Sequence, residues 1–224
     1  MSTASEQPLD HHTSIGGFRH GRVPRELREQ QLLDVAEEVF TELGFDGASI
    51  EEVSRRSGVK RPLFYTYFGG KDGLYLACYR RARQQLDQQL ASSAAAAIAE
   101  KGEGAGVQQV LEGMHHAYFE FLAGSLSRWE MLYGPGAATA GPIAEEVSQL
   151  RRNTVELLAG VFRNYVDPAV DDKTVLAFAH AGSGAAEQLA HWWRHAPELT
   201  IDQLKDLASR FSWAGLAQLL PEDG

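Results

Sequence analysis

Cysteine is nearly missing from this 224-residue chain, which contains Cys78 and no other. A single cysteine excludes an intrachain disulfide and any metal site built on two thiolates, and its apolar helical surroundings predict a small core residue. There is no run of about 18 or more apolar residues, which excludes a membrane-spanning helix. Residues 1–10 are polar and lack the apolar segment of a secretory signal, so we expect a cytoplasmic protein without a membrane partner.

Strand patterns and catalytic motifs are missing as well. No segment alternates convincingly between apolar and polar residues, so the periodic segments predict an all-α protein. Glycine-rich phosphate loops, nucleophile elbows and paired-histidine zinc helices are absent. A helical metal enzyme stays open as an alternative through two histidine groups, which are His115 and His116 with Glu120, and Glu187 with His191. Adjacent helical residues point about 100° apart, so core or surface roles explain these histidines more simply, and we expect neither cofactor nor metal.

Basic residues are outnumbered in the whole chain, yet they gather in one segment. The chain has 30 acidic and 21 basic residues, for a net charge of −9. Between Val53 and Lys71 there is no acidic residue, and the five basic ones are Arg55, Arg56, Lys60, Arg61 and Lys71. A local basic stripe on an acidic protein is typical of a confined nucleic-acid footprint. For Arg55 and Arg56 taken alone, a solvated helix face remains an equal alternative.

The same segment, residues 49–74, has the pattern of a helix-turn-helix. Ser49 and Glu52 form a capping box that predicts the start of a first helix. Gly58 stands where a tight turn between helices needs a positive φ. Pro62 is tolerated only in a first helical turn, so a second helix is expected to begin between Lys60 and Pro62.

The motif of this second helix resembles that of the TetR family of bacterial transcriptional regulators. The resemblance rests on Gly58, Val59, Pro62, Phe64, Tyr65, Tyr67, Phe68, Lys71 and Leu74, and covers about a fifth of the chain. Lys60 departs from it, since a serine or threonine usually caps the helix there. The resemblance implies an all-α protein with an N-terminal three-helix DNA-binding domain and a helical C-terminal domain. We divide the chain into a flexible basic arm (1–22), the DNA-binding domain (23–70) and an effector-binding and dimerisation domain (71–224).

Each exposed position of the helix-turn-helix receives an expected role on double-stranded DNA. Arg61 is the first candidate for a bidentate contact to guanine, and Tyr65, Thr66 and Tyr67 share base and phosphate contacts. Pro62 and Leu63 offer apolar contact to a thymine methyl group, while Ser49, Lys60 and Lys71 hold phosphates. For the arginines of the arm, minor-groove contact and simple solvation are equally good interpretations.

Helical periodicity continues to the end of the chain. The patterns predict helices over 24–43, 72–100, 107–126, 129–133, 142–166, 172–195 and 200–220. Gly44 is expected to cap the first of them, and a second capping box, from Thr200 to Gln203, is expected to open the last.

TetR-like proteins dimerise through their last two helices and bind effectors between the middle ones. By resemblance we expect a homodimer on a palindromic operator, with the interface at small or apolar positions, namely Ala179, Gly182, Ala186, Leu204 and Phe211. An unknown small-molecule effector is expected in a pocket whose candidates are Met114, Tyr118, Phe121, Trp129, Asn153 and Phe178. Each of these is also a plausible plain core residue.

The function expected from the sequence is a repressor that its effector releases from the operator. Activation stays open, because the sign of control depends on where the operator lies. A dimeric DNA-binding adaptor without an effector is the second alternative, and it differs from the first in lacking a cavity that a ligand can enter.

Overall fold

The computed structural model of the chain describes residues 24–101, 106–134, 143–195 and 198–221. These residues form nine α-helices and a short 3₁₀ helix, and no strand occurs among them. The helices are α1 (Arg25–Gly47), α2 (Ile50–Ser57), α3 (Arg61–Phe68), α4 (Lys71–Lys101), α5 (Val107–Ala123), α6 (Leu126–Tyr133), α7 (Ala144–Phe162), α8 (Asp172–Trp193), α9 (Ile201–Leu216) and η2 (Ala217–Leu219). The all-α prediction is confirmed. The predicted arm, residues 1–22, lies outside the described residues.

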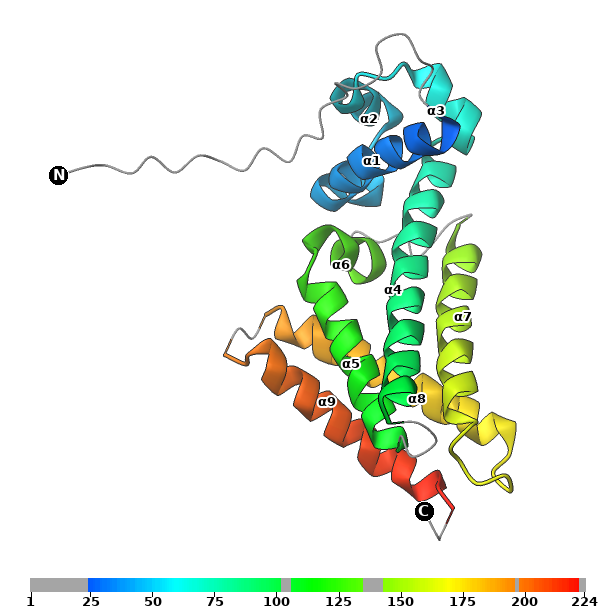
Figure 1. The fold of residues 1–224 in the computed structure, drawn as a ribbon. Helices are drawn as coiled ribbons and strands as arrows, with labels where there is room; N and C mark the ends of the chain where they lie inside the picture. The colour runs from blue at the N-terminus through cyan, green and yellow to red at the C-terminus, as the bar shows by residue number, and fades with distance from the viewer. Residues whose placement is uncertain (1–23, 102–105, 135–142, 196–197, 222–224) are drawn as a thin grey trace, which may run out of the picture.

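Helices α1, α2 and α3 form a small unit at one end of the molecule, and α4 runs from that unit into the C-terminal bundle (Figure 1). Its first turns help to form the N-terminal core, in which Leu32, Val39, Phe64 and Leu74 are fully buried. Cys78 is also fully buried there, and burial raises the pKa of its thiol well above the usual value. The prediction that Cys78 is a core residue is therefore confirmed.

The turns around the helix-turn-helix follow the sequence closely. Ser49 caps α2 by accepting a hydrogen bond from the Glu52 amide, and Gly58 ends α2 with a φ of 68°. Gly44 has the positive φ (67°) expected of a helix end, but α1 extends to Gly47 because one more helical turn follows that kink. The first helical segment therefore ends before Gly44 as predicted, and the added turn carries the element to Gly47.

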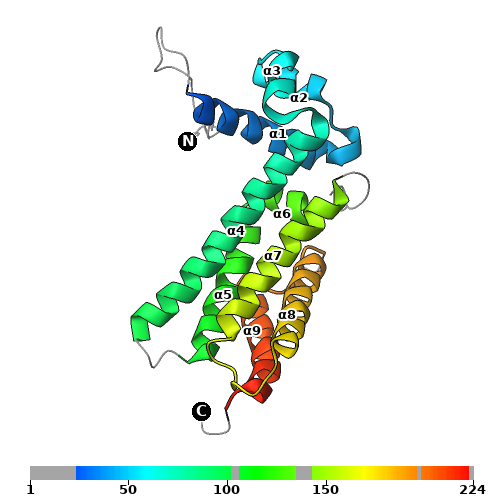
Figure 2. The same ribbon diagram turned by 90° about the vertical axis from the view of Figure 1, so that its right-hand side faces the viewer.

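The C-terminal bundle is built around α4 and α5, which pack against each other. Helix α9 packs on α5 and on α8, and α7 packs on α4 and on α8. Figure 2 shows α4 along one side of this bundle and α8 along the other. Thr200 and Gln203 form the predicted capping box at the start of α9. Within the described ranges, no helix is both long and apolar enough to cross a membrane.

Candidate nucleic-acid interface and effector cavity

Helix α3 turns one face inward and leaves the other accessible. Phe64 is fully buried against the N-terminal core, whereas Arg61, Pro62, Tyr65 and Thr66 are exposed. Leu63, Tyr67 and Phe68 are partly buried. The accessible face therefore carries donors, acceptors and an aromatic ring, and Tyr67, one of the predicted DNA contacts, belongs to it only in part.

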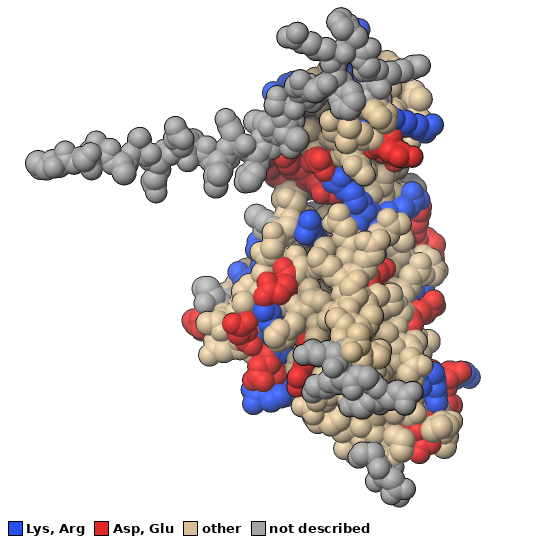
Figure 3. Space-filling view, in the orientation of Figure 1, with Lys and Arg blue, Asp and Glu red and all other residues tan. Residues whose placement is uncertain are grey.

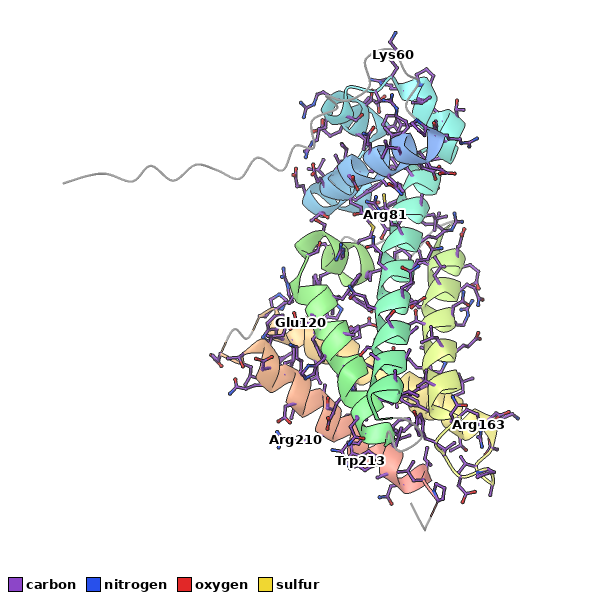
Figure 4. The ribbon with its side chains drawn as sticks, in the orientation of Figure 1. Lys60, Arg81, Glu120, Arg163, Arg210 and Trp213 are labelled. Atoms are coloured by element: carbon purple, nitrogen blue, oxygen red, sulfur yellow. The ribbon has the colours of Figure 1, made fainter. Side chains whose placement is uncertain are left out.

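Lys60 precedes α3 as its N-cap residue and makes no side-chain capping bond. Its side chain projects from the outer tip of the N-terminal unit (Figure 4). A lysine has no acceptor for the free amides of a helix start, which explains the missing bond. The side chain is thus left free to reach a phosphate beside a positive helix end.

Acidic residues accompany the basic stripe, which the count along the sequence did not reveal. Arg61 lies 2.5 Å from Glu51, and both side chains are more than half exposed. Arg55 and Arg56 both bind Glu52, and in the face that Figure 3 shows, acidic and basic side chains lie next to each other over this unit. Hydrogen bonds from Arg55 and then Arg56 lower the pKa of Glu52 to about 2.

Of the two hydrogen bonds of the predicted capping box, the one from the Ser49 amide to the Glu52 carboxylate is not formed. The Glu52 carboxylate instead accepts hydrogen bonds from the guanidinium groups of Arg55 and Arg56. Glu42 also forms an ion pair with Arg56. A charge-assisted bond to a guanidinium is stronger than one to a neutral amide. Exposed ion pairs stabilise a fold little, so the arginines can exchange these partners for DNA at modest cost.

Lys71 and Ser49 both have structural contacts besides the phosphate role predicted for them. The Lys71 ammonium donates to the Asp46 carbonyl (3.2 Å) and lies 4.5 Å above the Phe45 ring. The Ser49 hydroxyl is engaged as a helix cap. Arg25 is one of the arginines at the start of the first helix for which the sequence left minor-groove contact and solvation open, and it lies 5.2 Å from the Tyr67 ring beside α3.

A cavity lies inside the C-terminal bundle, and its empty space, counted together with the part that opens to solvent, is about 590 Å³. Its walls come from α4, α5, α6, α7, α8 and α9, and are lined by Arg83, Leu86, Leu90, Leu111, Met114, His115, Tyr118, Tyr133, Thr154, Leu158, Phe162, Phe178, Ala179, Gly182, Ser183, Ala186 and Ser212. Most of these side chains are apolar. The cavity is therefore suited to a largely apolar compound.

The structure brings three of the six predicted pocket residues to this wall, namely Met114, Tyr118 and Phe178. The other three are corrected. Asn153 is exposed on α7 and bonds to Gln149, Phe121 is buried beneath the Arg128 guanidinium, and Trp129 is buried against His191. Periodicity identifies these side chains as apolar or polar, but the packing of neighbouring helices decides which of them meet a cavity.

Polar groups on the cavity wall are few and specific. The Arg83 guanidinium donates to the hydroxyls of Tyr79 (3.1 Å) and Tyr133 (3.3 Å). His115 bonds through Nδ1 to the Leu111 carbonyl and through Nε2 to Ser212. Burial lowers the pKa of His115, so its imidazole is neutral near pH 7 and accepts the Ser212 proton. Of these residues, the sequence reasoning had named only His115.

Two family models match the chain. Residues 32–78 match the model described as bacterial regulatory proteins of the tetR family, and residues 107–215 match the tetracyclin repressor-like C-terminal domain. The chain belongs to the TetR family. It is therefore a DNA-binding transcriptional regulator with a helix-turn-helix, and not an enzyme.

Relatives and solved structures of TetR-type regulators cover most of the chain. The transcriptional activator FasR of Mycolicibacterium smegmatis is 24% identical over 205 residues, which are 91% of this chain and 90% of FasR. A TetR-like regulator from Rhodococcus sp. RHA1 is 27% identical, with a TM-score of 0.66 over 88% of this chain and 99% of that one. FadR of Bacillus subtilis, solved with stearoyl-CoA, shares the fold at 14% identity and a TM-score of 0.63. The match covers 85% of this chain and 97% of FadR.

Three of the five interface residues expected for a TetR-type dimer, Ala179, Ala186 and Leu204, are buried inside this subunit. Their placement on a dimer surface is corrected, because atoms covered within one protomer are not available to a second. Gly182 lines the cavity and is partly buried, so its expected role stays a prediction. Phe211 is exposed over 62% of its surface.

The histidine groups considered for a metal site are dispersed in this TetR-family fold. Glu120 binds Lys205, and Glu187 binds Arg151 at 2.6 Å. His116 is exposed, while His191 lies beside the Trp129 ring. Throughout the described ranges, no group of three histidine, cysteine or acidic side chains is arranged to hold a metal ion.

Proposed function

We propose that this TetR-family regulator acts as a homodimer that binds a palindromic operator through α3 and leaves it when a small molecule fills the cavity. The observation that carries the proposal is the double role of α4. Leu74 and Cys78 on α4 are buried in the N-terminal core, and Leu86 and Leu90 on the same helix line the cavity. One rigid element thus contacts both the DNA-binding unit and the effector site.

Rigid coupling through α4 explains how occupancy of the cavity alters DNA binding. A ligand that pushes α4 also shifts α3, since Phe64 on α3 packs in the same core as Leu74. Such a ligand must bind the released conformation more tightly than the DNA-bound one, because equal affinity for both shifts no population. The cavity and α3 therefore need no direct contact.

The outer faces of α8 and α9 support a dimer at different positions from those expected. The exposed positions of α8 include a stripe of mostly small residues, which are Ala177, Ala181, Gly184 and Gln188, while His180 and Trp192 are exposed as well. On α9 the neighbouring exposed residues are Leu207 (41% exposed), Phe211 and Ala214. Their spacing of three and four residues puts each set on one helix face, and small residues let a second pair of helices approach closely. We infer that this face forms the twofold interface.

Dimerisation is also what the DNA site requires. A single α3 of eight residues reads only a short stretch of one major groove. Two copies about 34 Å apart read successive grooves on one side of the duplex, and their twofold symmetry matches an inverted repeat. Arg61, Tyr65, Thr66 and Lys60 stay our proposed contacts, joined by Arg25.

The relatives support a regulator with an effector and leave both directions of control open. FadR of Bacillus subtilis was solved with stearoyl-CoA, so an apolar acyl compound is a reasonable first candidate for this cavity. FasR is an activator. We propose repression when the operator overlaps a promoter, since a bound dimer then excludes polymerase, and activation when the operator lies upstream.

Selection of bound duplexes from a random DNA library by the purified full-length protein tests the proposal. We expect an inverted repeat whose half-sites are one helical turn apart, and release of that repeat by acyl compounds in a mobility-shift assay. Enrichment of no sequence by the folded protein contradicts DNA recognition. An operator that no compound releases, together with a thermal-shift screen without hits, favours the adaptor alternative.

A further inference from the structure

Arg83 is an unusual component of an apolar cavity wall. Only 4% of its surface is exposed, and it lies in the middle of the helical bundle. Its two hydrogen bonds go to the neutral hydroxyls of Tyr79 and Tyr133, and its Nε has no hydrogen-bond partner among the described residues. A guanidinium remains charged inside a protein, so this wall carries a buried positive charge.

No carboxylate of the described residues forms an ion pair with Arg83. Asp87, one helical turn further along α4, accepts a hydrogen bond from Thr154 at 2.7 Å, and burial raises its pKa although Thr154 and the nearby charge of Arg83 oppose the rise. Glu187 across the bundle is engaged by Arg151. The Arg83 guanidinium also lies 5.7 Å from the Tyr79 ring and 5.5 Å from the Tyr133 ring, which compensates part of its desolvation. A carboxylate of a ligand would supply the ion pair that a buried cation requires for full compensation.

The cavity is polar at one end and apolar at the other. Arg83, Leu86 and Leu90 follow one another along successive turns of α4, a distance of about 10 Å at the usual rise per residue. The apolar lining includes Leu90, two turns beyond Arg83, and the rings of Phe162 and Phe178, which pack against each other. Side by side with α4 in Figures 1 and 2, α5 runs in the opposite direction.

This antiparallel pairing puts a second polar group near Arg83. Tyr118 lies toward the end of α5 and Leu111 toward its start, so the tyrosine faces the polar end and the leucine faces the apolar end. The Tyr118 hydroxyl is buried next to the Tyr133 side chain, and it forms no hydrogen bond of regular geometry in the described part of the chain. Tyr118 is therefore a second candidate donor at the end where the cation lies.

We propose that the cavity binds an aliphatic carboxylate, with the head group on Arg83 and Tyr118 and the chain directed toward Leu90 and Phe162. This inference rests on the proposed function, because it assumes that the cavity is an effector site. A guanidinium and a carboxylate form a charge-assisted pair, and a water-poor cavity strengthens it. The phenol donates a further hydrogen bond to the carboxylate, and the apolar walls cover the alkyl chain.

The decisive comparison uses pairs of ligands that differ only in their head groups. Calorimetric titration of the full-length protein with octanoate, dodecanoate and hexadecanoate is compared with the alcohol and the methyl ester of each chain length. We expect at least one carboxylate to bind about tenfold or more tightly than its neutral partners. Equal affinity for acid and alcohol, or no binding at any chain length, overturns the proposal.

Variants test whether the preference for the carboxylate over the alcohol depends on Arg83. In Arg83→Gln the carboxylate is expected to lose about tenfold or more in affinity, while the alcohol is affected little. Arg80→Gln is the matched control on the same helix, because Arg80 is exposed and pairs with Glu146 on the surface. Equal loss of acid and alcohol in Arg83→Gln contradicts the charge role. If that variant does not fold, Tyr118→Phe, which keeps the ring and removes the donor, must still weaken the acid more than the alcohol.

Two further arms separate this inference from the proposed function. Dodecanoyl-CoA, in which a thioester replaces the carboxylate, must bind the cavity less tightly than dodecanoate; tighter binding means that the acyl chain rather than the charge is recognised, and overturns the inference. Calorimetric titrations without DNA measure only whether the protein prefers the carboxylate head group. A carboxylate that binds but does not release the operator contradicts the effector role alone, whereas release by a neutral compound without preference for the acid contradicts only the inference.

Discussion

The guanidinium of Arg81 on α4 lies 2.7 Å from the carboxylate of Glu37 on α1, and the same guanidinium also lies 2.8 Å from Asp34. Figure 4 shows Arg81 where the long helix leaves the N-terminal unit. Arg83, only two residues further along α4, is already on the cavity wall. The ion pair therefore ties the DNA-binding unit to the helix that lines the cavity.

Removal of Arg81 is expected to lower stability and to weaken this tie. The side chains of Arg81 and Glu37 are both largely buried, so Arg81→Met leaves a carboxylate without its partner and is expected to lower the free energy of unfolding by about 1–3 kcal/mol. Burial raises the pKa of Glu37 even though Arg81 opposes the rise. A neutral Glu37→Gln is consequently expected to cost less than Arg81→Met.

Urea unfolding of the two single variants and the double variant measures the coupling between these groups. The double variant is expected to lose less than the sum of the single losses. The ratio of operator affinities without and with effector is expected to fall toward one in Arg81→Met. An unchanged ratio together with additive stability losses contradicts a role of this pair in transmission.

Arg61 is expected to read a base. Arg61→Ala is predicted to lower operator affinity by about 1–3 kcal/mol and to relax the preference at one base pair in each half-site. Lys71→Ala is predicted to weaken all duplexes similarly, with a small loss of stability because Lys71 also bonds to the Asp46 carbonyl. Binding of a matched set of single-base operator variants measures both effects.

Glu51→Gln is the control for Arg61, since it removes the exposed partner of the arginine but keeps the guanidinium. Sequence preference is expected to persist in this variant, while the affinity for any duplex rises slightly because a negative charge near the phosphates is lost. Equal loss on operator and random DNA in Arg61→Ala refutes the base contact.

Phe211 is expected to anchor the dimer. Phe211→Glu removes one apolar contact from each protomer of a twofold dimer, and is predicted to weaken association by about 3–6 kcal/mol in total. Sedimentation at micromolar concentration is expected to show a monomer with unchanged helix content. Ile98→Glu is the control, because Ile98 is an exposed apolar residue on α4, outside the proposed face. A dimer that survives Phe211→Glu places the interface elsewhere.

His115 is expected to make stability depend on pH in mildly acidic solution. Burial lowers its pKa in the folded protein below the usual 6.5, so the unfolded chain binds its proton first as the pH falls. Stability is present above 6.5 and is lost below it, with a slope of at most about 1.4 kcal/mol per pH unit, until the lowered pKa is reached.

Urea unfolding between pH 8 and the onset of carboxyl titration measures this slope. His115→Asn, whose amide can still donate to the Leu111 carbonyl, is expected to flatten it. His116→Asn, at the exposed neighbouring position, is expected to keep it. If both variants show the slope of the unchanged protein, the dependence has another source.

The features that the sequence predicted best are those that depend only on interactions between residues close together in the chain. The Ser49 cap, the left-handed Gly58, the start of α3 near Pro62 and the capping box at Thr200 all follow from backbone sterics and from bonds three or four residues apart. Their spacing also carried the resemblance to the TetR family.

Packing between distant segments decided the rest. The pairing of Arg61 with Glu51, the exposure of Asn153 and the burial of Leu204 depend on which helices meet, and no local pattern specifies that. Arg83 is the clearest case. In the sequence it is one of several arginines in a polar helix, and only the closure of six helices around it makes it a buried charge on a cavity wall. A local motif determined the family of this protein, whereas burial, which exists only once the bundle has closed, decided the chemistry of its cavity.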